Sequence, residues 1–262
     1  MGLSPVQFSI TFAAILADGS VVTWGDPSSG GDSTAVQDQL RNVRQIQATV
    51  GAFNAILADG SVVTWGDRRY GGDSSAVRDL LANVWQIRAA YFFLGVALAA
   101  ILSDGSVVTW GDLKFGGDSS GVQDQLKNVK HVQTTQAAFA AILADGSVTT
   151  WGDPRSGGDS SDVQDQLQNV RQIQSTGRGG DDGAFAAILA NGSVVSWGDP
   201  RYGGDSSAVC DQLRKVQQIQ STFGPFGGHS FAAISADGSV TSWGFRRASG
   251  GCSAIQDQVQ YL

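Results

Sequence analysis

The sequence is poor in the residues that disulfide, metal and imidazole chemistry require. Its 262 residues include two cysteines, two histidines and one methionine. Cys210 and Cys252 replace different positions of the repeat described below, so we expect no structural disulfide. His131 and His229 have no metal-ligand spacing around them, so the sequence predicts no metal, no cofactor and no catalytic residue. These absences favour a binding protein over an enzyme.

Basic charge and long hydrophobic runs are also scarce. The 24 acidic residues outnumber the 17 basic ones, for a net charge of -7, which disfavours nucleic acid and anionic membranes as partners. The most apolar run, residues 91–102, is well short of the roughly 20 residues that cross a bilayer. Residues 1–10 lack the charged and apolar regions of a signal peptide. We therefore expect no membrane insertion and a cytoplasmic or organelle-stromal location.

A nine-residue pattern, Asp-Gly-Ser-Val-Val-Thr-Trp-Gly-Asp, recurs along the chain. Its turn dipeptide, Asp-Gly or once Asn-Gly, begins at positions 18, 59, 104, 145, 191 and 237, and these spacings of 41 to 46 residues are typical of β-propeller repeats. The 35 glycines suit short strands and tight turns. We predict a single all-β domain over residues 1–262, made of six repeats of about 4–44, 45–85, 86–130, 131–171, 172–217 and 218–262.

Each repeat is predicted to form a propeller blade of four antiparallel strands. In the second repeat these are residues 45–49 (strand A), 53–58 (strand B), 61–65 (strand C) and a weaker 76–80 (strand D). Alternation along strand C places Trp65 on a face that packs against the neighbouring blade. The same structural role is predicted for its counterparts Trp24, Trp110, Trp151, Trp197 and Trp243.

One position of the predicted innermost strand is polar in every repeat where it can be aligned. The third repeat has Arg88 there, and the others have glutamine: Gln47, Gln133, Gln174 and Gln220. These side chains are expected to surround the central axis. We expect them to bind one another or water rather than an ion or ligand.

The repeats differ in length only between strands A and B. In an up-and-down blade the A-to-B and C-to-D connections emerge at the same end, so one face varies and the other does not. Arginine and aromatic side chains on loops over a rigid scaffold favour a protein-binding face. The alternative is that these loops vary in sequence without having a function. The candidate partner-binding residues are Arg68, Arg69, Tyr70, Tyr91, Phe92, Phe93, Lys114, Phe115, Arg155, Arg178, Arg201, Tyr202, Phe223, Phe226, His229, Arg246 and Arg247.

The repeat resembles the RCC1 repeat family. The resemblance rests on Ala-Phe-Ala-Ala-Ile-Leu-Ala-Asp-Gly-Ser-Val-Thr-Thr-Trp-Gly-Asp at 138–153, followed by Gly157 and Gly158, and on Gly-His-Ser at 228–230. The short period is similar to that of propellers of the β-lactamase inhibitor protein II type. A departure is Gly-Gly-Asp-Ser at 71–74, where the family has Gly-Gln-Leu-Gly. The resemblance implies an RCC1-like β-propeller. Such propellers usually have seven blades, whereas the repeat count predicts six four-stranded blades here, with seven blades or an incompletely closed ring as the alternative.

The resemblance does not imply one activity, because RCC1-like propellers include exchange factors, parts of HERC-type ubiquitin ligases and enzyme inhibitors. We expect a non-catalytic protein-interaction propeller, acting as a scaffold or subunit of a larger assembly or as a regulator of a partner protein. One alternative is an inhibitor-type propeller that covers a partner's active site. Another is a lectin-like propeller for small ligands, suggested by the repeated tryptophans and aspartates. The sequence leaves the identity of the partner and the oligomeric state open.

Overall fold

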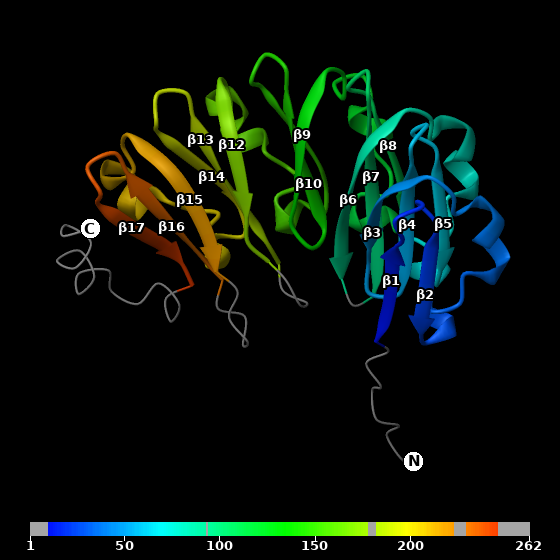
Figure 1. Cartoon of the computed structure of the whole chain (residues 1–262). Helices are drawn as coiled ribbons and strands as arrows, with labels where there is room; N and C mark the ends of the chain where they lie inside the picture. The colour runs from blue at the N-terminus through cyan, green and yellow to red at the C-terminus, as the bar shows by residue number, and fades with distance from the viewer. Residues whose placement is uncertain (1–9, 93, 178–181, 223–228, 246–262) are drawn as a thin grey trace.

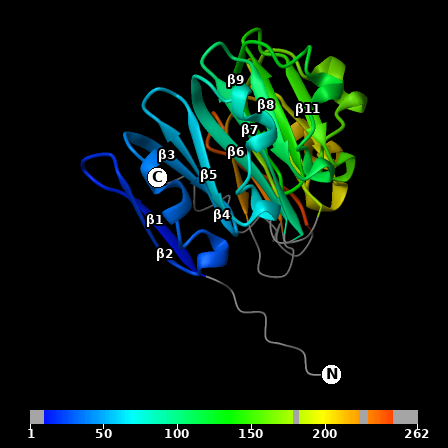
Figure 2. The same ribbon diagram turned by 90° about the vertical axis from the view of Figure 1, so that its right-hand side faces the viewer.

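The computed structural model describes residues 10–92, 94–177, 182–222 and 229–245. This part of the chain is all-β and forms six antiparallel sheets, one with two strands and five with three. Figure 1 shows the sheets following one another along an arc, and the turned view in Figure 2 shows the sheets from β1 to β11 in the same order. The sheets are β1 (Thr11–Ile15) and β2 (Val21–Gly25); β3 (Val43–Ala48), β4 (Ala52–Leu57) and β5 (Val62–Gly66); β6 (Val84–Phe92), β7 (Gly95–Leu102) and β8 (Val107–Gly111); β9 (Val129–Thr134), β10 (Ala138–Leu143) and β11 (Val148–Gly152); β12 (Val170–Ser175), β13 (Ala184–Leu189) and β14 (Val194–Gly198); β15 (Val216–Thr222), β16 (Ser230–Ser235) and β17 (Val240–Gly244).

The Asp-Gly turn sets the register of each strand B–strand C hairpin. Gly60 has a φ of 80°, which glycine adopts without steric cost. The Asp59 carboxylate accepts hydrogen bonds from the Ser61 hydroxyl at 2.7 Å and the Ser61 backbone N–H at 2.9 Å, and these bonds lower the pKa of Asp59. The turn aligns Ile56 with Val62 across the hairpin. The repeated Asp-Gly-Ser sequence therefore specifies the hairpin that builds every sheet.

The fourth strand predicted for each blade is wrong in the first five repeats, and in the sixth its segment lies outside the described residues. In the second repeat, residues 76–80 lie in the 3-10 helix η4 (Ser75–Leu80), and η3 (Arg68–Tyr70) precedes it. Asp73 Oδ1 accepts a hydrogen bond from the Ser75 backbone N–H at 2.9 Å, a local bond that competes with strand pairing. The corresponding 3-10 helices are η1 (Pro27–Ser29), η2 (Thr34–Gln39), η5 (Leu113–Phe115), η6 (Ser120–Val122), η7 (Pro154–Ser156), η8 (Ser161–Gln166), η9 (Pro200–Tyr202) and η10 (Ser207–Gln212).

The hydrophobic core lies between successive sheets. Trp151 is typical: its ring stacks on Phe139 with centroids 4.9 Å apart, and its Nε1 donates to the Gly116 carbonyl of the preceding unit at 3.1 Å. Leu126 and Phe115 of that preceding unit pack into the same cluster. Five of the repeated tryptophans are buried in such positions: Trp65, Trp110, Trp151, Trp197 and Trp243.

The sixth tryptophan departs from the predicted packing between blades. Trp24 stacks on Phe12 with centroids 5.2 Å apart, yet 50% of its surface is exposed, because β1 and β2 form the first sheet of the arc. The segments that would precede and follow the arc, residues 1–9 and 246–262, lie outside the described residues. The number of blades and the closure of a ring therefore stay predictions.

Within the described ranges, no helix combines the length and the apolar character that crossing a membrane requires.

Because the tryptophans differ in exposure, replacing them by alanine should lower the free energy of unfolding by different amounts. Trp151→Ala should lower the free energy of unfolding by ~3–5 kcal/mol, since it empties a buried site. Trp24→Ala should cost about half as much, because half of that side chain already contacts solvent. Urea unfolding followed by circular dichroism compares the two variants. An equal loss of unfolding free energy in both variants would contradict the exposed position of Trp24.

Candidate functional site

The strand A–strand B connections and the 3-10 turns after strand C meet at one end of each sheet. Hydrogen bonds join the two segments: Thr49 Oγ1 donates to the Tyr70 carbonyl at 2.7 Å, and Thr176 Oγ1 donates to the Tyr202 carbonyl at 2.9 Å. We call this the loop end, formed by the A–B connections and by η1, η3, η5, η7 and η9. The Asp-Gly turns form the turn end, along the upper edge of the arc in Figure 1. The sequence predicts this shared end for the two sets of loops, and the structure places them there.

Two arginines at the loop end are held in defined positions. The Arg69 guanidinium lies 2.6 Å from Asp67 Oδ2 and 5.5 Å from the Tyr70 ring centroid. The fifth unit repeats this arrangement, with Arg201 2.6 Å from Asp199. The hydrogen bond from Arg69 holds the pKa of Asp67 below its usual range. These contacts order the arginines while leaving their side chains exposed.

The predicted partner-binding residues have different accessibilities. Five are exposed at the loop end: Arg68, Arg69, Lys114, Arg155 and Arg201. Tyr70 and Tyr91 are half-buried. Arg68 pairs with Asp73 at 2.6 Å, whereas Lys114 and Arg155 form no ion pair with any described residue. The loop end therefore offers unpaired positive charge although the whole chain is acidic.

Three of the candidate residues are not exposed, and the interpretation of them as accessible loop residues is wrong. Phe115 and Tyr202, the last residues of their 3-10 turns, point inward and pack between sheets with a phenylalanine and a tryptophan of the following unit. His229 is also buried, with its ring 5.5 Å from that of Tyr202. These side chains support the loop end from beneath.

The remaining candidates cannot be placed. Phe93, Arg178, Phe223, Phe226, Arg246 and Arg247 lie outside the described residues. Phe92 ends β6, and its side chain is not among the described parts of the structure.

Sequence reasoning missed three exposed apolar side chains at the loop end. Val50, Leu94 and Leu113 are 54%, 66% and 72% exposed. They come from consecutive units: the A–B connections of the second and third units, and the turn after strand C of the third. Leu113 could have been noticed, because the other repeats have proline or arginine at this position: Pro27, Arg68, Pro154 and Pro200.

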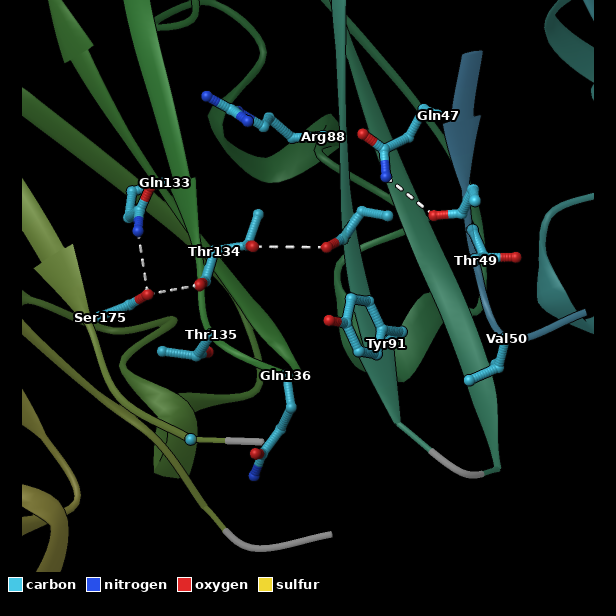
Figure 3. A pocket seen from close by; sticks show the side chains of 13 residues that line it. Gln47, Thr49, Val50, Arg88, Tyr91, Gln133, Thr134, Thr135, Gln136 and Ser175 are labelled. Carbon is cyan, nitrogen blue, oxygen red and sulfur yellow. Dashed lines mark hydrogen bonds between the residues drawn. The ribbon is translucent and has the colours of Figure 1, made fainter. Parts of the chain in front are cut away.

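A cavity of about 530 Å³ lies between the inner strands β3, β6, β9 and β12. Val50 and Gln136 line it near the loops, while Arg88 reaches from β6 into the space between Gln47 and Gln133 (Figure 3). The Gln47 amide donates to the Ala48 carbonyl at 2.8 Å, and the Gln133 amide donates to Ser175 Oγ at 3.1 Å. Gln47 and Gln133 therefore bond to a backbone carbonyl and a serine hydroxyl of the protein, and not to one another as the sequence predicts.

Arg88 differs from these glutamines. Its Nε is shielded from solvent and has no hydrogen-bond partner among the described residues. Burial lowers the pKa of the guanidinium. His131, on β9, has its pKa lowered by burial and then by the positive charge of Arg88. The cavity therefore carries a local positive charge.

In the part of the chain that the structure describes, no three histidine, cysteine or acidic side chains come together in a way that could hold a metal ion.

The coupling of Arg88 to His131 is testable. Arg88→Gln introduces the residue of the equivalent repeats and removes a positive charge, so it should raise the pKa of His131 toward its usual value of about 6.5. An NMR titration of the imidazole Cε1–H signal measures this shift. Arg78→Gln, an equal charge change on the exposed η4, should leave the pKa of His131 unchanged. An unaltered or lowered pKa in Arg88→Gln would refute the coupling.

Comparison with known proteins finds low-identity matches among solved structures. No protein-family model matches the chain, and no curated protein matches it. The crystal structure of Prp20p from Saccharomyces cerevisiae, reported with its binding to Gsp1p and histones, is 18% identical, with 90% of this chain and 70% of that chain covered and a TM-score of 0.49. Human WBSCR16 is 18% identical, with 89% and 73% covered and a TM-score of 0.48. Yeast RCC1 (Prp20) bound to Kap60 is 17% identical, with 96% and 72% covered and a TM-score of 0.49. Solved structures of RCC1 are thus among the structures that this chain resembles, as the repeat sequence suggests.

Proposed function

We propose that this chain is a non-catalytic protein-interaction propeller that binds a partner protein through its loop end. The observation that carries the proposal is the exposure of three apolar side chains at the loop end of two consecutive units, Val50, Leu94 and Leu113. Ordered arginines such as Arg69 lie at the same end. Interfaces combine apolar contact area with arginine and aromatic anchors. The role is that of a scaffold, of a subunit of a larger assembly, or of a regulator of the bound partner.

The loop end also suggests the chemistry of the partner surface. Lys114 and Arg155 are exposed and form no ion pair with a described residue, and the neighbouring Leu113 is the most exposed of the three apolar side chains. A complementary surface would place acidic side chains around an apolar centre, which steers association and excludes basic partners. The Asp-Gly-Ser turns at the turn end, by contrast, repeat with little change in sequence.

Serine substitution of Val50, Leu94 and Leu113 together tests the proposal. The triple variant should weaken partner binding at least tenfold, which corresponds to about 1.4 kcal/mol. Affinity capture from the native source with the wild-type chain, followed by mass spectrometry, identifies the partner, and the dissociation constant is then measured for each variant. The thermal unfolding midpoint should change little, because all three side chains are exposed.

The matched control is Leu80→Gln. Leu80 is 59% exposed on η4, away from the loop end, and other repeats have glutamine at this position, as in Gln39 and Gln166. This variant should bind like the wild type. Wild-type affinity in the triple variant, or an equal loss in Leu80→Gln, would argue against a loop-end interface.

A further inference from the structure

The central strands depart from the repeat at two adjacent places. Arg88 pairs with Ala99 across its sheet, the register position at which Gln133 pairs with Ala140. His131, on the next sheet, is also an exception, since the equivalent residues are glutamine: Gln45, Gln86, Gln172 and Gln218. Both exceptions introduce a basic group, and the charge of Arg88 acts on His131. Because the other copies fold with glutamine, packing alone does not require these basic residues.

Among the described residues, none compensates the charge of Arg88. The side chain is half-buried, and its Nε has no hydrogen-bond partner within the described residues. No described residue forms an ion pair with it, and the described residues that line the cavity include no acidic side chain. A partly desolvated cation without a partner is unfavourable. A negatively charged ligand would relieve this cost.

We propose that Arg88 anchors an oxyanion-binding site in the central cavity, for a small molecule that carries a carboxylate or a phosphate group. The planar guanidinium can donate two parallel hydrogen bonds to either group. The cavity volume of about 530 Å³ lies within the range of small-molecule sites. The site extends beyond the proposed protein interaction and does not depend on it.

Calorimetric titration with inorganic phosphate and, separately, with acetate tests the site at constant ionic strength. The wild-type chain should bind at least one of the two anions saturably. Arg88→Gln should weaken that binding at least tenfold, because the two parallel N–H donors of the guanidinium are lost. Arg88→Lys, which keeps the positive charge but lacks the paired guanidinium donors, should bind the anion with intermediate affinity. Tighter binding of phosphate identifies phosphorylated molecules as the ligand class, and tighter binding of acetate identifies carboxylates.

Arg78→Gln is the control, because it makes the same charge change and also introduces the residue found at Gln37, Gln123 and Gln164. It should bind the anions like the wild type. The Nε–Hε NMR signal of Arg88 should shift with the same dissociation constant as the heat signal. Equal binding by Arg88→Gln and the wild type, no saturable binding by the wild type, or an Arg88 signal that does not shift would overturn the proposal.

Discussion

The structure depends on one contact, which joins each sheet to the sheet before it. A tryptophan ring stacks on a phenylalanine of its own sheet while its Nε1 donates to a glycine carbonyl of the preceding unit, as Trp197 does to Gly157 at 3.0 Å. Gly157 has a φ of 90°, and a Cβ atom there would lie 2.7 Å from the Phe185 ring. The glycine and the two aromatic residues therefore have to occur together. Their recurrence keeps the sheets in a constant relation along the arc.

The third unit is where this contact is weakest and where the proposed binding features concentrate. Leu98 stands in place of the stacked phenylalanine, and Trp110 Nε1 has no hydrogen-bond partner among the described residues. Its strands β6 and β7 are longer than their counterparts. Arg88 and Leu113 belong to the same unit. The repeat therefore maintains the scaffold, and its exceptions coincide with the proposed binding features.

The sequence was sufficient for features that recur or that depend on local turn chemistry. Asp59 and Gly60 predict the hairpin, and the alternation around Trp65 predicts packing between sheets. It was insufficient where local hydrogen bonds compete with strand pairing, as at Asp73 and Ser75. It also failed where a turn decides the direction of a side chain: a loop position does not reveal that Phe115 points inward and Leu113 outward. The exposure of Val50, Leu94 and Leu113 needed the structure, because they come from separate segments.

The account holds that constant elements form the scaffold and that a partner covers the loop end. Hydrogen–deuterium exchange of the chain, alone and in complex with a captured partner, tests this claim most directly. Protection is predicted at residues 49–51 and 113–116, with unchanged exchange at the Asp-Gly turns. Protection confined to the Asp-Gly turns, with unchanged exchange at residues 49–51 and 113–116, would contradict the account.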